Sequence, residues 1–199
     1  MRLAFFSGFA FLAVVTASAV MPAHAQQTGG ISVTGGGGNS NLARGPLSQS
    51  DQSATTLGGT ASGRGRVITN GGNNRNAALG VGSLAGQDTT TVGGVATGRG
   101  RVITNGGNNN NLARGFGSTA TQSTATVGGV ASGAGRSVTN GGLNTNRATG
   151  AFSEADQQVV TLGGTAGRRG TNIVNGGSNR NAATGVGSSA SQQIFTGSQ

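Results

Sequence analysis

Small residues alternate with variable ones along two short stretches that recur throughout the chain. The first has the form Asn/Gly-x-Ala-x-Gly-x-Gly, as at 76–82, and the second has the form Ser/Arg-x-Ala/Ile-x-Gln/Asn, as at 83–87. A two-residue alternation is typical of a β-strand. The density of glycine and the lack of an apolar i, i+3, i+4 stripe oppose a helix. The pattern therefore predicts short strands joined by tight turns such as Asn-Gly-Gly.

The same pattern returns with a fixed period of 35 residues. The tripeptide Asn-Gly-Gly begins at Asn70, Asn105, Asn140 and Asn175, which defines the units 36–70, 71–105, 106–140, 141–175 and a truncated 176–199. Inside each unit an alanine register advances alternately by 18 and 17 residues, so a repeat contains two half-repeats: Ala43, Ala61, Ala78, Ala96, Ala113, Ala131, Ala148, Ala166 and Ala183. Equally spaced strands and turns favour an all-β fold of stacked coils, a β-solenoid.

An amide side chain lies nine residues after each alanine of this register. These residues are Gln52, Asn70, Gln87, Asn105, Gln122, Asn140, Gln157, Asn175 and Gln192. In stacked coils each amide would lie about 4.8 Å from its equivalent, and such ladders satisfy their own donors and acceptors. We therefore predict one ladder of nine amides around a thin interior of alanine and glycine. Nine half-repeat coils would span roughly 40 Å, although the period leaves open whether a coil is a half or a full repeat.

The N-terminus has the features of a secretory signal peptide. A basic Arg2 precedes an apolar stretch, and Ala23-His24-Ala25 forms an A-x-A cleavage site. We expect 1–25 to be removed, leaving a Gly-rich segment 26–35 and a repeat domain 36–199. No later stretch is apolar enough to span a bilayer. The mature chain is expected to pass through the periplasm to the cell surface or the extracellular space, and not to be transmembrane.

Composition excludes most catalytic chemistry. After the leader the chain has no Cys, His, Lys, Trp, Tyr or Met. Ser-His and Cys-His nucleophilic catalysis therefore has no base, and metal sites of His or Cys are excluded. We expect neither an enzyme nor a cofactor. Large apolar residues number 29 of 174, so the chain is either disordered or ordered by backbone ladders and stacked small side chains.

Arginine supplies all of the positive charge of the mature chain. The 12 arginines outnumber the four acids, and five of them form a candidate basic stripe: Arg64, Arg66, Arg99, Arg101 and Arg136. Such a stripe could attract an anionic polysaccharide or lipopolysaccharide, or it could be an exposed face that limits lateral association. Specific nucleic-acid binding is not expected, because only three phenylalanines are available for base stacking.

The repeats resemble those of curlin, the subunit of bacterial curli fibres. Curlin repeats combine Gly-x-Gly-Asn-x-Ala with flanking glutamines, and the counterparts here lie at 80–87, 115–122 and 185–192, with Ser in place of that Asn. The resemblance is one of architecture and covers nearly all of the mature chain. It implies a functional amyloid of a biofilm matrix or cell-surface coat. It also implies partners that are further copies of the chain, together with export and nucleation factors.

The leading hypothesis is therefore a secreted structural protein that assembles into curli-like fibres. Two alternatives stay open. One is a monomeric surface-binding solenoid, either an adhesin or an ice binder that uses threonines such as Thr89, Thr90 and Thr91. The other is a disordered Gly-rich matrix protein.

Overall fold

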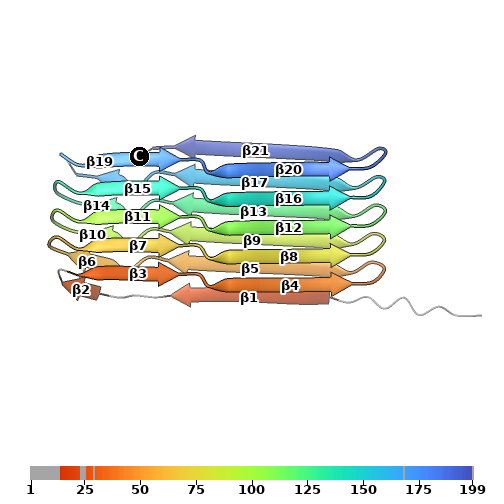
Figure 1. Ribbon diagram of the computed structural model, residues 1–199, viewed down its shortest axis with the longest axis horizontal. Helices are drawn as coiled ribbons and strands as arrows, with labels where there is room; N and C mark the ends of the chain where they lie inside the picture. The colour runs from red at the N-terminus through yellow and green to blue at the C-terminus, as the bar shows by residue number, and fades with distance from the viewer. Residues whose placement is uncertain (1–13, 23–25, 29, 168, 199) are drawn as a thin grey trace, which may run out of the picture.

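The chain folds into a stack of parallel strands in which each 35-residue repeat adds one layer (Figure 1). This computed structural model describes residues 14–22, 26–28, 30–167 and 169–198. The predicted cleavage site at 23–25 lies outside the described residues. The described part contains strands and turns only, arranged as a β-solenoid of about five turns. The predicted fold class is thereby confirmed.

Two of the four sheets contain the longer strands. The nine-residue sheet consists of β1 (Val14–Pro22), β5 (Gln49–Leu57), β9 (Leu84–Val92), β13 (Thr119–Val127), β17 (Glu154–Leu162) and β21 (Ser189–Gly197). The seven-residue sheet consists of β4 (Gly38–Arg44), β8 (Asn73–Leu79), β12 (Asn108–Arg114), β16 (Leu143–Thr149) and β20 (Ser178–Thr184).

The other two sheets are shorter. The five-residue sheet consists of β3 (Ile31–Gly35), β7 (Arg66–Asn70), β11 (Arg101–Asn105), β15 (Arg136–Asn140) and β19 (Thr171–Asn175). The narrow sheet consists of β2 (Gln26–Thr28), β6 (Thr60–Ser62), β10 (Val95–Ala96), β14 (Val130–Ala131) and β18 (Thr165–Ala166).

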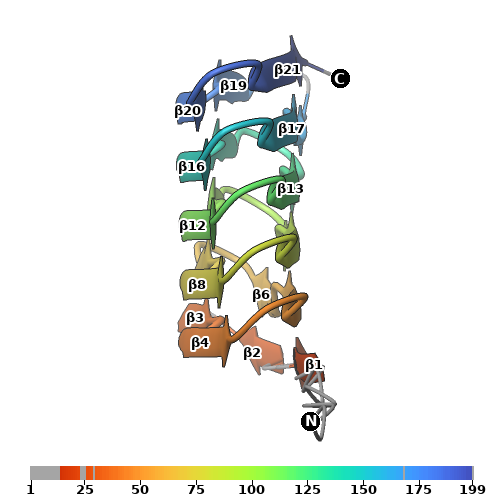
Figure 2. The ribbon, with the colours of Figure 1, turned by 90° about the vertical axis from the view of Figure 1, so that its right-hand side faces the viewer.

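One turn of the solenoid has two broad faces. The five- and seven-residue strands follow each other across one face, and the nine-residue sheet forms the opposite face together with the narrow sheet (Figures 1 and 2). Every strand pairs with the strand 35 residues away, as in Arg66↔Arg101 and Gln52↔Gln87. A coil is therefore a full repeat. The alternative of nine coils of one half-repeat each does not hold, because the two half-repeats of a unit, such as β4–β5 and β6–β7, lie side by side within one coil and each contributes one strand to each face.

The stack also extends beyond the predicted repeat boundary. β3 ends before Gly36, yet it pairs in register with β7. Within the predicted leader, β1 pairs with β5 and occupies the outer edge of the nine-residue sheet. The first regular turn thus begins upstream of 36, in the segment that the sequence assigned to a separate Gly-rich region.

The interior between the two faces is thin and largely polar. Alternate residues of each strand are buried, as in β9 and β12. Small apolar residues form two clusters, one containing Ala78, Ala85, Ala113, Ala120, Ala148 and Ala155 and the other containing Ala61, Val67, Ala96, Val102 and Ala131. The other buried side chains are mainly Asn, Gln, Ser and Thr. The predicted interior of small residues is present, and columns of polar side chains complete it.

Buried threonines of this interior differ in whether their hydroxyl groups have partners. Thr104 is fully buried in β11, and among the described residues its Oγ1 has no hydrogen-bond partner. Thr89 is equally buried in β9 but donates its Oγ1 hydrogen to Asn109 Oδ1 at 3.1 Å. The two positions form a matched pair for measuring the cost of an unsatisfied hydroxyl.

We expect Thr104→Val to stabilise the fold and Thr89→Val to destabilise it. Valine removes the unpaired hydroxyl of Thr104 at nearly constant volume, which should raise the free energy of unfolding by about 1 kcal/mol. At Thr89 the same change removes a buried hydrogen bond and leaves Asn109 short of a donor, at a cost of about 1 kcal/mol. Denaturant unfolding followed by circular dichroism measures both, and equal shifts of the two variants would contradict the assignment.

Candidate functional site

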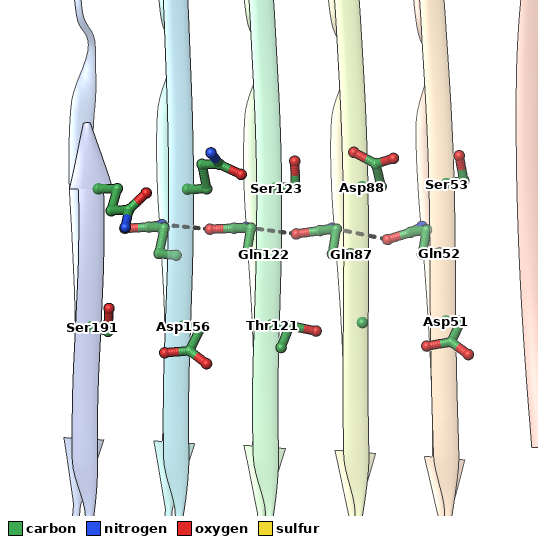
Figure 3. Close-up of a pocket in the computed structure, with 14 residues that line it drawn as sticks. Asp51, Gln52, Ser53, Gln87, Asp88, Thr121, Gln122, Ser123, Asp156 and Ser191 are labelled. Atoms are coloured by element: carbon green, nitrogen blue, oxygen red, sulfur yellow. Dashed lines mark hydrogen bonds between the residues drawn. The ribbon is translucent and has the colours of Figure 1, made fainter. Parts of the chain in front are cut away.

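A column of glutamines follows the centre of the nine-residue sheet. Gln87 donates its Nε2 hydrogen to Gln52 Oε1 at 2.9 Å, and Gln122 donates in the same way to Gln87 at 2.7 Å. Gln157 and Gln192 continue the series toward the C-terminus. The first four glutamines are buried, and Figure 3 shows the column from strand to strand. The predicted ladder therefore exists for the five glutamines.

The four predicted asparagines form a second, separate ladder. Asn105 donates from Nδ2 to Asn70 Oδ1 at 2.7 Å, Asn140 donates to Asn105 at 2.8 Å, and Asn175 donates to Asn140 at 3.1 Å. These asparagines end the strands of the five-residue sheet; the first three are partly buried, and Asn175 is exposed. The single ladder of nine amides is wrong, because its alternate members belong to opposite faces of the solenoid.

Two further asparagine ladders lie on the seven-residue sheet and are more deeply buried. One contains Asn39, Asn74, Asn109, Asn144 and Asn179, with side-chain bonds of 2.7 to 2.8 Å between successive members. The other joins Asn76, Asn111, Asn146 and Asn181 by side-chain hydrogen bonds, and Asn41 lies in register before Asn76. The signal that could have identified both ladders is an asparagine at the same position of every 35-residue unit.

The second of these ladders also joins the two faces. Asn111 donates from Nδ2 to the backbone oxygens of Ala85 at 2.9 Å and Thr121 at 2.8 Å. Both oxygens belong to the nine-residue sheet, in β9 and β13. Asn146 repeats the arrangement with the oxygens of Ala120 and Asp156. Each turn is thus cross-linked to the opposite face by a buried amide.

The ladders have a direction, and it differs between the faces. In the glutamine ladder and the Asn70 ladder each residue donates to its equivalent one turn earlier. In the Asn74 and Asn76 ladders each residue donates to its equivalent one turn later. Each end of the stack therefore presents a defined set of donors and acceptors, and the two ends are complementary.

The two ends of the stack are not equally covered. β21 is the last strand of its sheet, and every one of its residues except Gly197 is exposed. In the preceding strand β17, alternate residues such as Ala155 and Gln157 are buried. At the other end Gln52 is 3% exposed, yet among the described residues its Nε2 has no hydrogen-bond partner. Both ends of the glutamine ladder thus have unused hydrogen-bonding capacity.

The predicted basic stripe lies on one broad face. Arg66, Arg101 and Arg136 are adjacent in register at the start of β7, β11 and β15, and all three are exposed. Arg64 and Arg99 are exposed in the turns that precede these strands. The other described arginines belong to the same face or to its turns: Arg44, Arg75, Arg114, Arg147, Arg169 and Arg180.

The acids lie on the opposite face. Asp51, Asp88, Glu154 and Asp156 all belong to the nine-residue sheet. Three of them border a groove of about 800 Å³ that follows the glutamine column, with Asp51 and Asp156 on one side and Asp88 on the other (Figure 3). Across the described residues, no group of three or more His, Cys, Asp or Glu side chains could hold a metal ion. The solenoid therefore has one basic face, formed by the five- and seven-residue sheets, and an opposite face that contains all the acids.

The threonine surface considered for ice binding does not form. Thr89 and Thr91 point into the interior, and only Thr90 is partly exposed. Its register neighbours are Thr55, Ala125, Val160 and Phe195, a mixed set. The regular outward array of threonines that ice binding requires is therefore missing on this sheet.

No family model, curated protein or solved structure matches this chain. Within the described ranges, no helix has the length and apolar character needed to cross a membrane. The ladders, the two faces and the two ends of the stack are the features of the molecule that bear on its function.

Proposed function

We propose that the protein is a secreted structural subunit that assembles end to end into extracellular fibres similar to those of curlin. The observation that carries this proposal is the open last turn. Its strands continue four parallel sheets, yet no described strand covers them. An uncovered strand edge is a template for another chain. Within the described residues the last turn repeats the strands of the turns before it, and this similarity favours a second copy of the chain as the cover.

The ladders support the same proposal energetically. Repeat proteins gain stability mainly from contacts between neighbouring units, and stacked amides add hydrogen bonds along the stack. The last turn lacks those contacts on one side. Ile194 and Phe195 of β21 are 51% and 58% exposed, whereas Val159, in register with Ile194, is 1% exposed. A second copy that covered this turn would remove apolar surface from water.

The arginine face supplies a second part of the proposed function, contact with anionic matrix. Arg66, Arg101 and Arg136 lie on neighbouring strands about 4.8 Å apart, and no acid lies on their sheet. A column of unpaired cations attracts polyanions, with a strong dependence on salt. We propose that this face binds an anionic polysaccharide or lipopolysaccharide at the cell surface.

One experiment tests both parts. Purified residues 26–199 are compared with the variant Arg66→Glu, Arg101→Glu and Arg136→Glu by electron microscopy, fibre diffraction and binding to alginate. We expect both proteins to form fibres with a meridional reflection near about 4.8 Å. Only the original chain should bind alginate strongly, with at least about tenfold weaker binding by the variant because three cations become anions. The variant Asp51→Asn, Asp88→Asn and Asp156→Asn is the control, and its binding should not fall.

The outcomes separate the remaining hypotheses. A protein that sediments as a monomer at high concentration, without fibres, contradicts the assembly proposal. If that monomer still binds alginate through the three arginines, the surface-binding solenoid is favoured, which the exposed arginine column already supports. Equal binding by the original chain and the arginine variant contradicts the matrix contact. The disordered alternative does not agree with the ordered fold.

A further inference from the structure

We infer that the first turn of one copy docks on the last turn of another in one defined register, and that the leader strand β1 occupies this docking position until it is removed. The inference rests on the proposed function and specifies its interface. The partner is a second copy of this chain. The surfaces are the β3–β4–β5 edge of one copy and the β19–β20–β21 edge of the next.

The leader strand shows where an added strand lies. β1 pairs with β5 through Val14↔Gln49 and Pro22↔Leu57, parallel and without a bulge. β17 pairs with β21 through the equivalent positions, Glu154↔Ser189 and Leu162↔Gly197. β1 and β21 therefore occupy equivalent positions in the sheet, five repeats apart. β21 of a second copy can take the place of β1 beside β5, and the two strands cannot occupy it together.

The glutamine ladder distinguishes the two occupants. Ala17 is the residue of β1 in register with Gln52, and alanine has no side-chain acceptor for the unpaired Nε2 of Gln52. The equivalent residue of β21 is Gln192, which gives its Nε2 to Gln157. Its Oε1 lies at the end of the ladder and is the acceptor that Gln52 lacks. A second copy therefore satisfies a buried donor that the leader leaves unpaired.

The asparagine ladder of the seven-residue sheet favours the same register, although its side chains donate in the opposite direction along the stack. Asn39 donates to Asn74 at 2.8 Å, so the Oδ1 of Asn39 lies at the start of its ladder. Asn179 accepts from Asn144 at 2.7 Å, and its Nδ2 is the donor at the other end. Stacking β4 of one copy on β20 of the next brings this donor to that acceptor. A half-repeat shift would instead place β20 beside a strand of another sheet.

One ladder is interrupted at the junction. Gly35 occupies the position that Asn70 holds in the next turn, so Asn175 of one copy would lie beside a glycine of its neighbour. The junction therefore continues three of the four amide ladders. It is consequently expected to be the weakest interface between turns along the fibre, and the place where fibres break.

Disulfide trapping tests the register. In residues 26–199, which contain no cysteine, Gln193→Cys and Ser53→Cys would become neighbours across the junction, because Gln193 is equivalent to the residue in register with Ser53. Their Cα atoms would lie about 4.8 Å apart, within disulfide range. The matched control pairs Ser191→Cys with Ser53→Cys, about 8 Å apart and beyond that range. Under oxidation we expect about tenfold more disulfide-linked dimer from the first pair.

The leader is tested with the uncleaved chain 1–199. Its last turn is free but its first turn is covered by β1, so we expect it to form no fibres alone and to shorten fibres when mixed with residues 26–199. Ser18→Pro with Ala19→Pro should restore assembly, since one of two adjacent prolines must remove a backbone donor to β5. Fibre lengths from electron microscopy give the readout.

The results distinguish the inference from the proposed function. Absence of fibres from residues 26–199 overturns the proposed function. Fibres that form equally well from the uncleaved chain, or equal trapping of both cysteine pairs, overturn the docking inference and leave the proposed function standing.

Discussion

Gly106→Ala is expected to destabilise the solenoid by roughly 3 kcal/mol or more. Gly106 is buried at the corner between β11 and β12. An added Cβ would overlap Thr126 Oγ1 of the opposite face and lie 2.6 Å from the backbone oxygen of Gly141 in the next turn. Neither neighbour can move freely, because the carbonyl belongs to the stacked corner and the threonine is buried in β13. Unfolding in urea, followed by circular dichroism, measures the loss.

Gly35→Ala is the matched control for this corner. It is the last residue of β3, one position before the equivalent corner, and nothing lies within 4 Å of its added Cβ. Its stability should change by no more than about 0.5 kcal/mol. Equal effects at Gly35 and Gly106 would mean that the cost comes from glycine's backbone freedom and not from close packing at the corner.

Asn111→Ala is expected to cost roughly 3 kcal/mol. Asn111 is fully buried, donates to two backbone oxygens of the nine-residue sheet and to Asn146 Oδ1 at 3.0 Å, and accepts from Asn76 at 3.1 Å. Alanine removes all these bonds and leaves a cavity. It thereby interrupts the asparagine ladder and also breaks the link from this turn to the opposite face. In repeat folds each turn is stabilised only by its neighbours. We therefore expect the turns before the substituted turn and the turns after it to unfold in two separate steps.

The adjacent residue offers the control for this change. Asn110 is exposed on the same strand, so Asn110→Ala should alter the free energy of unfolding by no more than about 0.5 kcal/mol. The midpoint and shape of the urea transition give both readouts. If the two variants unfold alike, the buried asparagines do not join the faces in the way the hydrogen bonds indicate.

The sequence was sufficient to predict strands, turns and the period, because alternation and spacing depend only on local chemistry. It was not sufficient to decide which strands stack. The alanine register treats Gln87 and Asn105 as equivalent, but β9 is nine residues long and β11 is five. Parallel pairing in register requires strands of matching length, and only the 35-residue step supplies them.

The buried asparagine ladders were missed for a different reason. The pattern places Asn76 at the start of a predicted strand without a ladder partner, and Asn74 lies next to the Asn-Gly-Gly turn, where asparagine is common. Asparagine recurs at both positions in every 35-residue unit. This recurrence indicates a ladder only once a full repeat is known to form one coil. The separation of charge between the faces can likewise be recognised only once each strand is assigned to a face. The acids such as Asp51 and Asp88 occupy nine-residue strands, whereas Arg66 and Arg101 begin five-residue strands on the opposite face.

The strict pairing of equivalent strands has a consequence for how such a chain can evolve. Gain or loss of one whole 35-residue unit leaves every remaining sheet and ladder intact, whereas loss of a half-repeat would place a five-residue strand against a nine-residue one. The stretches 63–74 and 98–109 are identical in sequence, so recombination between their coding segments would remove one complete turn. The number of turns is therefore a property that inheritance can change in single steps without disturbing the fold.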